Sequence, residues 1–582
     1  MSNLIQRRIA NPDLVLPASL HPLLRRIYTH RNLKNADELE LGLGNLLAPD
    51  SLRGLEVATA LLLAALQQQQ RILIVSDFDT DGATSCVVAI QALRGFGCTQ
   101  VDYIVPNRFE YGYGLTPEIV ELAKTRQPDL IITVDNGISS IEGVAAARQA
   151  GIAVLITDHH LPAAATPAAN AIVNPNQQGC DFPSKCIAGV GVIFYVMLAL
   201  RAKLRELDWF SEQGLKQPNL ASLLDLVALG TVADVVALDR NNRILVDEGL
   251  KRIRAGRACA GIKALLEIAR RDARKITASD LGFSVGPRLN AAGRLDDMST
   301  GIECLLADHP GGAYKLALQL DQLNTDRKQI EAGMRDQAFK YLNDLSIEAE
   351  ALPAALCLFD SDWHQGVVGI LASRVKDKYH RPVIAFAAVN DGDGGATELK
   401  GSARSIKGFH IRDALDAVAS RNPGLISKFG GHAMAAGLSL QSDSFEEFQQ
   451  AFQAEAARMI DPELLQARIF SDGLLEPEYF SLETAAALTW AGPWGQEFPE
   501  PLFDGRFNLI NHRRVGENHL KLTLSPLTAP QQSLDAIAFN VASEKWPGAD
   551  VSEIEIAYRL QINEFRGQQT VQLMVEHILA FS

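Results

Sequence analysis

Short apolar runs rich in β-branched residues alternate with helical patterns through the first third of the chain. The runs RILIV, VDYIV, DLIITV, IAVLIT and AIV follow one another between residues 71 and 173. One helical pattern starts at Thr116 with Pro117 in its first turn, and another ends at Gly151. Thr and Pro favour helix starts, and Gly favours helix ends. Strands that alternate with helices predict an α/β unit built on a mostly parallel sheet.

The pattern changes three times after this unit. Residues from about 190 to 335 read mainly as helix, and LALQLDQLNTDRKQIEAGMRDQAFKYLND predicts one or two long exposed helices that form a connector. A second, smaller α/β unit starts near Leu352 with AALCLFD, VVGILASRVKDKYH and RPVIAFAAV. Strand-like runs from about residue 467 onward predict a small barrel such as an OB-fold.

These changes divide the chain of 582 residues into predicted segments. They are an N-terminal segment at 1–55, a catalytic α/β domain at 56–325, a connecting helix at 326–350, a second α/β domain at 351–460 and an OB-like barrel at 467–582. A chain of this length can bury sizeable cores without disulfides to stabilise them.

The charge balance argues against a protein that binds nucleic acid simply through a basic surface, because the formal net charge is -14. A nuclease stays open, since a site made of carboxylates is acidic and bound cations reverse the local field. Seven cysteines without a C-x-x-C pair predict a reduced, cytoplasmic protein. The N-terminus lacks a signal-peptide core, and apolar stretches such as VGVIFYVMLAL are too short to cross a membrane.

Three carboxylates follow the first apolar run. Asp77, Asp79 and Asp81 alternate, so an extended backbone places their side chains on one face. Taken alone, the D-x-D-x-D-G pattern is also typical of calcium loops and solvated turns. Carboxylates packed together repel one another unless cations bind, and hard oxygen ligands favour Mg²⁺ or Mn²⁺.

Further acidic and histidine residues end later runs. Asp135 ends the run DLIITV, Asp158-His159-His160 ends IAVLIT, and Asp234 lies in the apolar GTVADVV. Singly, each has an ordinary interpretation: a turn or helix cap, a cap with surface histidines, and a buried ion pair. Ligands of open α/β sheets bind at the carboxyl ends of strands, so these positions converge in space. Such a set can hold two cations, which activate water and stabilise charge on phosphoryl oxygens.

The motifs, taken in order, resemble those of a known family. DFDTDGATS, VDNG, DHH and GTVADVV resemble the ordered motifs of the DHH phosphoesterase family. PNRFEYGYGL, GPRLNAAGRLDD, LNTDRKQIE, WHQGVVGI, GSARS and FGGHAMAAGLSL are similar in order and spacing to the RecJ exonucleases of that family, and the last two to its DHHA1 domain. The resemblance spans nearly the whole chain, and no motif position departs from it.

The resemblance implies roles for the residues of the first domain. The implied ligands of two Mn²⁺ or Mg²⁺ ions, with Asp135 as the bridge, are Asp77, Asp79, Asp81, Asp135, His159 and Asp234. His160 would contact the scissile phosphate or act as general acid, and Asp158 would orient the histidines.

The resemblance also implies phosphate contacts. The residues expected to hold the 5′-terminal phosphate are Ser402, Arg404, Gly430, Gly431 and His432. Arg108, Arg288 and Arg294 are further phosphate candidates, because the guanidinium is a planar fork of donors that matches phosphate oxygens. An ordinary ion pair is the alternative interpretation of Arg294.

The implied activity is exonucleolytic degradation of single-stranded DNA from 5′ to 3′, releasing 5′-mononucleotides, in DNA repair and recombination. The strand would thread between the two α/β units, and the barrel would add affinity through a basic groove and stacking aromatics. Its candidate basic residues, each of which also fits a solvated barrel face, are Arg506, Arg513, Arg514, Lys521, Arg559 and Arg566. We also expect a monomer with no membrane contact, and the resemblance implies a single-strand-binding protein and a repair helicase as partners.

Two other functions compete with this one. Relatives of the DHH family resemble pyrophosphatases, nanoRNases and cyclic-dinucleotide phosphodiesterases, which are usually shorter chains without the barrel. An inactive scaffold that recruits partners through its barrel would lack metal ligands, whereas all of them are present here. The additional barrel favours a polymer substrate.

Overall fold

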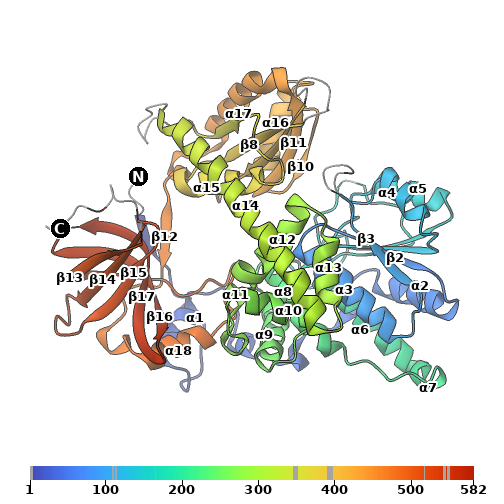
Figure 1. Ribbon diagram of the computed structural model, residues 1–582, viewed down its shortest axis with the longest axis horizontal. Helices are drawn as coiled ribbons and strands as arrows, with labels where there is room; N and C mark the ends of the chain where they lie inside the picture. The colour runs from blue at the N-terminus through green and yellow to red at the C-terminus, as the bar shows by residue number, and fades with distance from the viewer. Residues whose placement is uncertain are drawn as a thin grey trace.

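The computed structural model of the chain describes residues 4–107, 111, 114–163, 165–344, 352–389, 398–516, 518–541, 546 and 551–581. Figure 1 shows an α/β unit in blue and green, a smaller unit in yellow and orange, and a β-barrel in red. A long helix, α14, runs from the first unit to the second (Figure 1). Among the described residues, we find no helix whose length and apolar character would let it cross a bilayer.

The first sheet is parallel throughout and has the order β3-β2-β4-β5-β6. Its strands are β2 (Ile72–Ser76), β3 (Val101–Ile104), β4 (Leu130–Val134), β5 (Ala153–Thr157) and β6 (Ala171–Val173). The helices on its two faces are α2 (Leu55–Gln67), α3 (Thr80–Gly95) and α6 (Gly189–Glu206) on one, and α4 (Pro117–Lys124) and α5 (Ile141–Gln149) on the other. Alternate residues of β2 enter the two cores, so both faces are apolar. The predicted parallel α/β sheet is confirmed.

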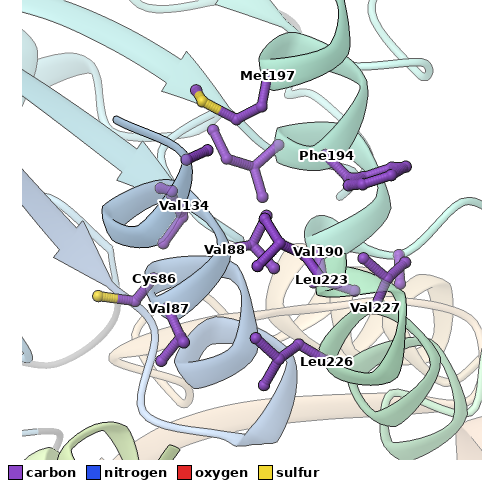
Figure 2. Close-up of a cluster of buried hydrophobic side chains, with 14 of the residues drawn as sticks. Cys86, Val87, Val88, Val134, Val190, Phe194, Met197, Leu223, Leu226 and Val227 are labelled. Atoms are coloured by element: carbon purple, nitrogen blue, oxygen red, sulfur yellow. The ribbon is translucent and has the colours of Figure 1, made fainter. Parts of the chain in front are cut away.

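Three helices pack against one another near the carboxyl edge of this sheet. Val88 of α3, Val190 of α6 and Val227 of α8 (Leu224–Ala233) belong to one buried cluster (Figure 2). A Cβ added at Gly230 would lie 2.3 Å from Thr84 Oγ1, so α8 and α3 approach at a glycine. This packing holds the ends of α3, α6 and α8 close together at the sheet edge.

The remainder of the first unit is helical, as expected. Its helices are α7 (Trp209–Glu212), α9 (Arg240–Arg254), α10 (Ala260–Ile268), α11 (Ala278–Asp280), α12 (Gly286–Leu295) and α13 (Ser299–Leu306). A π-helical turn over Leu281–Val285 leads directly into α12.

The connector differs from its prediction in length and burial. We expected a connecting helix at 326–350, but α14 already begins at Pro310 and is described to Asp344, and residues 345–350 lie outside the described residues. It is not an exposed rod, because Ala317 and Leu320 are buried in the first unit and Met334 and Ala338 are buried against the second. An apolar stripe along α14 therefore packs on both units, and the many charged residues of the segment concealed it in the sequence.

The second unit holds a mixed sheet of order β10-β11-β9-β8-β7. Its strands are β7 (Leu356–Phe359), β8 (Val383–Val389), β9 (Glu398–Arg404), β10 (Lys428–Gly431) and β11 (Ala435–Gln441), and its helices are α15 (Val368–Tyr379), α16 (Ile411–Arg421) and α17 (Phe445–Met459). Only β7 and β8 pair in parallel among these described strands.

The C-terminal strands close into the predicted barrel, with the order β13-β14-β15-β17-β16. The barrel strands are β13 (Phe503–Val515), β14 (His519–Pro526), β15 (Leu534–Ala538), β16 (Glu553–Phe565) and β17 (Gln568–Phe581), preceded by β12 (Arg468–Ser471) and α18 (Leu482–Trp490). Every described strand in the closed order has two neighbours, so this sheet presents no open edge.

The N-terminal segment joins the barrel in space. Strand β1 (Leu4–Arg7) pairs in parallel with β12, and α1 (Pro22–Thr29) inserts Leu23 and Ile27 into the barrel core. Arg31 donates hydrogen bonds from both Nη atoms to the Asp472 carboxylate, at 2.8 and 3.1 Å. Residues from the two ends of the chain therefore build one unit.

Candidate metal centre

The loop after β2 carries two carboxylates that cap local backbone. Asp79 is the N-cap of α3 and accepts a hydrogen bond from Gly82 N at 3.0 Å. Asp77 is buried and accepts from Phe78 N at 2.7 Å. Both side chains lie at the carboxyl edge of the sheet, as the strand–loop–helix pattern predicted.

Asp81 meets a different element. Its two oxygens accept hydrogen bonds from Gly189 N at 2.7 Å and Val190 N at 2.9 Å, the first amides of α6. Burial and the charge of Asp79 raise the pKa of Asp81 to about 7 despite these bonds. The carboxylate thus joins the start of α3 to the start of α6.

Asp135 directly follows β4 and has a left-handed backbone conformation, with a φ of 63°. A Cβ added at Gly189 would lie 2.6 Å from Asp135 Oδ1, so the carboxylate rests against a residue without a side chain. Burial, followed by the charges of Asp81 and Asp79, raises the pKa of Asp135 well above its usual range. The chain holds this carboxylate where its charge is costly.

His159 points one nitrogen into this group of carboxylates. Its Nε2 lies 3.1 Å from Asp135 Oδ1 and 3.4 Å from Asp234 Oδ2. Burial and the charge of His160 lower the pKa of His159 to about 3, so the ring is neutral at ordinary pH. A neutral imidazole carries one lone pair, and Nε2 makes no hydrogen bond to described residues, so with the proton on Nδ1 it can offer that lone pair to a cation.

His160 is held by its neighbour in the triplet. Its Nδ1 lies 2.7 Å from Asp158 Oδ1, and Asp158 is buried. Burial alone would lower the pKa of His160, but the hydrogen bond and charge of Asp158 outweigh it and raise the pKa to about 9. Conversely, burial would raise the pKa of Asp158, and the same bond and charge lower it to about 2. The two histidines of one triplet therefore differ in charge at neutral pH.

The side chains fit a divalent cation. Ligand atoms lie within 4.8 Å of one another in each of three overlapping groups: Asp135, His159 and His160; Asp81, His159 and Asp234; Asp77, Asp79 and Asp135. Buried Asp234 Oδ2, like His159 Nε2, makes no hydrogen bond within the described part of the chain. Burial and the charges of Asp81 and Asp79 raise the pKa of Asp234 well above its usual range. Oxygen donors with one neutral imidazole suit Mg²⁺ or Mn²⁺, whose charge would relieve this repulsion.

The second unit faces the centre through a histidine. The ring of His432 stacks on that of His160, with centroids 5.7 Å apart. His432 directly follows Gly430 and Gly431 at the end of β10. Arg404 and Ser402 lie on β9, where Arg404 Nη1 donates to Ser402 Oγ at 3.1 Å. Gly430 and Gly431 thus end a strand instead of forming the expected loop, and His432 after them lies beside the DHH triplet.

The arginines of α12 make protein contacts. Arg288 Nε donates to Asp321 Oδ1 at 2.8 Å on α14. Arg294 Nη1 donates to the carbonyl of Gly366, at 3.2 Å, across the junction between the two units. Arg108, the third arginine predicted to contact phosphate, lies outside the described residues.

Sequence reasoning missed the residues that fix the histidines. Asn174 Nδ2 donates to the carbonyl of His160 at 2.9 Å, and Asn176 Nδ2 donates to the carbonyl of His159 at 2.6 Å. Asn174 follows β6, so the rule that strand-end polar residues converge could have singled it out. The amides of Gly189 and Val190 left no such signal, because any residue type other than proline supplies an amide N–H.

Three of the six candidate basic residues on the barrel have acidic neighbours. Arg506 lies 3.4 Å from Glu555, Lys521 lies 3.1 Å from Asp535, and Arg559 lies 2.7 Å from Glu500, measured between charged atoms. The Arg566 guanidinium lies 5.2 Å from the exposed Phe565 ring, at the hairpin between β16 and β17. The basic charge of the barrel is therefore largely balanced where these pairs lie.

Comparison with known proteins matches all three units. The DHH family N-terminal domain matches residues 71–231, the DHHA1 domain residues 352–458 and the RecJ OB domain residues 471–577. The single-stranded-DNA-specific exonuclease RecJ of Escherichia coli (strain K12) is 54% identical over 574 residues, which cover 99% of this chain and 98% of that protein. The chain belongs to the RecJ family.

Other RecJ proteins agree with this assignment. RecJ of Haemophilus influenzae is 52% identical over 583 residues and 99% of both chains. The crystal structure of RecJ in complex with Mn²⁺ from Thermus thermophilus has a TM-score of 0.78 and 28% identity, and the match covers 99% of this chain and 79% of that one. This RecJ-family fold is therefore shared across the three units.

Proposed function

We propose that this chain hydrolyses single-stranded DNA from its 5′ end with two Mn²⁺ or Mg²⁺ ions and releases 5′-mononucleotides. The observation that carries the proposal is the buried Nε2 of His159, which faces Asp135 and Asp234 at 3.1 and 3.4 Å in a chain of the RecJ family. The names of the relatives, single-stranded-DNA-specific exonucleases, support the substrate.

The proposed metal ligands are those expected from the motifs. They are Asp77, Asp79, Asp81, Asp135, His159 and Asp234. Asp135 is the proposed bridge, because Asp135 and His159 each belong to two of the three ligand groups and only the carboxylate has two oxygens to share between two ions. Asp81 already accepts two amide hydrogen bonds, and its oxygens keep further lone pairs for a cation. Bound ions supply an activated water and stabilise charge on the phosphoryl oxygens.

The proposed role of His160 rests on its charge. Its pKa of about 9 keeps it protonated at neutral pH, so it can donate a hydrogen bond to the scissile phosphate or a proton to the leaving oxygen. Asp158 orients the ring through the 2.7 Å contact to Nδ1.

The proposed polarity rests on a phosphate anchor in the second unit. Ser402, Arg404 and the Gly430-Gly431-His432 segment would hold the 5′-terminal phosphate, and the stacking of His432 on His160 supports an anchor beside the reacting bond. Arg108, Arg288 and Arg294 would contact phosphates farther along the strand. Arg294 would do so from the junction between the two units, where it bonds to Gly366.

The wider setting is also a proposal. We infer that the chain acts as a cytoplasmic monomer in DNA repair and recombination, with a single-strand-binding protein and a repair helicase as partners. The exposed Phe565 beside Arg566 supports a contribution of the barrel to strand binding by stacking and charge.

The test uses a long single-stranded DNA labelled at either end, with Mn²⁺ or Mg²⁺ and a chelator control. We expect immediate, metal-dependent release of labelled mononucleotide from the 5′ end, with duplex DNA spared. Asp135→Ala should abolish release while single-strand binding remains measurable. The matched control is Asp129→Ala, because Asp129 precedes β4 whereas Asp135 follows it, and Asp129 accepts from Arg71 N at 2.7 Å, away from the site.

Two other results would contradict the proposed function. Release from the 3′ end would contradict the polarity and the phosphate anchor. An intact polymer beside rapid turnover of dinucleotides or pyrophosphate would contradict the substrate and leave the barrel without a role.

A further inference from the structure

Asn290, in the middle of α12, holds the loop that carries the site carboxylates. Its Oδ1 accepts a hydrogen bond from Thr80 N at 2.8 Å and another from Thr80 Oγ1 at 2.7 Å. Thr80 is buried and stands between Asp79 and Asp81 in the chain. One amide oxygen thus holds the residue on which the spacing of these two carboxylates depends.

The bond satisfies a group that the helix cannot. Thr80 is the first residue of α3, so its N–H has no partner within the helix. A buried N–H without a partner costs about 1–3 kcal/mol. The Asn290 carbonyl oxygen removes this cost only while the start of α3 stays in one place.

One face of α12 is devoted to this loop. Gly286, Asn290 and Gly293 are spaced i, i+4 and i+7, which places them on one side of the helix. Thr80 Oγ1 also lies 3.2 Å from the Gly286 carbonyl. A Cβ added at Gly293 would lie 1.8 Å from the carbonyl oxygen of Phe78, so the helix backbone touches the loop backbone directly.

The same helix reaches the second unit. Arg294 follows Gly293 and donates to the Gly366 carbonyl, while a Cβ added at Gly366 would lie 2.2 Å from the Arg294 carbonyl oxygen. The π-helical turn over Leu281–Val285 sets the start of α12, and such turns are frequent at functional sites. The contacts with Gly366 therefore fix the C-terminal end of α12, and Asn290 accepts the hydrogen bonds of Thr80 from a fixed position.

From these contacts we propose that Asn290 is a positioning residue that sets the spacing of Asp79 and Asp81 for divalent cations. The inference rests on the proposed metal site. Mg²⁺ and Mn²⁺ bind best when ligand distances are near ideal, so a small displacement of the start of α3 weakens binding. Asn290 acts through Thr80, because its amide oxygen accepts hydrogen bonds from both the amide and the hydroxyl of that residue.

The experiment measures Mn²⁺ binding to the full-length protein without DNA, by calorimetry and by the electron paramagnetic resonance signal of free Mn²⁺. We expect Asn290→Ala to weaken Mn²⁺ binding by about 10- to 100-fold, the usual effect of losing a residue that orients ligands. Asn290→Asp keeps an acceptor for both Thr80 donors, so its affinity for Mn²⁺ should stay within about threefold of that of the parent protein. Thr80→Val removes only the hydroxyl donor and should fall between the two.

The matched control is Asn170→Ala. Asn170 Oδ1 likewise accepts from a backbone amide, Val154 N, at 2.9 Å, but at the other end of β5. Its loss should leave the Mn²⁺ affinity unchanged. Thermal unfolding in chelator should confirm that each variant is folded.

Two results would overturn the inference: parental Mn²⁺ affinity in folded Asn290→Ala, or a loss in Asn290→Asp as large as in Asn290→Ala. If Asn290→Ala does not fold, Thr80→Val and Asn290→Asp replace it. Parental Mn²⁺ affinity in folded Thr80→Val, or a loss of about 10- to 100-fold in folded Asn290→Asp, would then overturn the inference. A parent protein that binds Mn²⁺ but leaves DNA intact would instead contradict the proposed function alone.

Discussion

At the scale of single residues, the candidate centre depends on the absence of a side chain at Gly189 as well as on its ligands. The carboxylate of Asp135 occupies the space that a side chain at Gly189 would need. Asp135 and Val235 both adopt a left-handed backbone, with φ of 63° and 61°. Such conformations cost non-glycine residues energy and cluster at functional sites.

A methyl group at Gly189 should therefore disturb the centre. Its Cβ would lie 2.6 Å from Asp135 Oδ1 and must displace the carboxylate. We expect Gly189→Ala to weaken Mn²⁺ binding by about 10- to 100-fold and to lower the rate of DNA degradation. Gly333→Ala, where a Cβ meets nothing within 4 Å, is the control. Unchanged Mn²⁺ affinity in a folded Gly189→Ala protein would contradict this account.

The strain at Val235 gives a prediction about stability. A β-branched residue at φ 61° costs about 1–3 kcal/mol, whereas Asn tolerates this conformation. Val235 is exposed, so little packing is lost. Val235→Asn should raise the melting temperature in chelator, and Val236→Asn, at a partly buried neighbour packed on the core, should lower it. Equal losses in both variants would argue against strain.

At the scale of elements, a buried ion pair between Arg31 and Asp472 is one of the contacts that join the N-terminal segment to the barrel. Arg31 and Asp472 have side chains that are 0% and 1% exposed. Burial alone would raise the pKa of Asp472, but hydrogen bonds from His30 and Arg31 and the charge of Arg31 outweigh it and lower the pKa. A lowered carboxyl pKa stabilises the fold above the unfolded pKa of about 3.9 and ceases to do so as pH falls through the folded value.

Asp472→Asn should therefore destabilise this unit at neutral pH. Removing one partner of a buried pair costs about 3–5 kcal/mol, and the difference from the parent should shrink as pH falls below about 4. Urea unfolding followed by tryptophan fluorescence, to which Trp494 beside this pair contributes, would measure it. Asp535→Asn, which breaks the more exposed pair with Lys521, should cost at most about 1 kcal/mol. A difference that persists unchanged at pH 3 would contradict the linkage.

At the scale of the whole molecule, the proposed chemistry needs two units held face to face. The stacking of His160 on His432 and the bond from Arg294 to Gly366 join them, and α14 packs on both. The net charge of -14 shows that any attraction of DNA is local. We therefore expect single arginines of the second unit to contribute measurably to DNA binding.

Arg404→Ala should reduce the preference for a 5′-phosphate over a 5′-hydroxyl end. A hydrogen bond to a charged group contributes about 1.5–3 kcal/mol, which corresponds to about 10- to 100-fold in kcat/KM. The measurement compares matched oligonucleotides that differ only at the 5′ end. Lys407→Ala, at an exposed lysine beyond the end of β9, is the control and should leave the preference intact. Unchanged preference in Arg404→Ala would move the phosphate anchor elsewhere.

The sequence by itself determined the parts of this protein that depend on local order. Strand-end positions of Asp77, Asp135 and Asp158, the parallel sheet and the closed barrel all follow from periodicity and from the rule that carboxyl ends of parallel strands share an edge. These features could be predicted because each pattern lies within one strand–loop–helix unit or one run of strands.

Only the tertiary structure decided the contacts between distant segments. Examples are the amides of Gly189 and Val190 at Asp81, the pairing of β1 with β12, the true extent of α14 and the bond from Thr80 to Asn290. The physical reason is that an amide N–H or an amide oxygen can bond to many partners, so the residues next to it in the chain do not specify which partner it finds. Packing selects the partner when it brings segments that are hundreds of residues apart into contact.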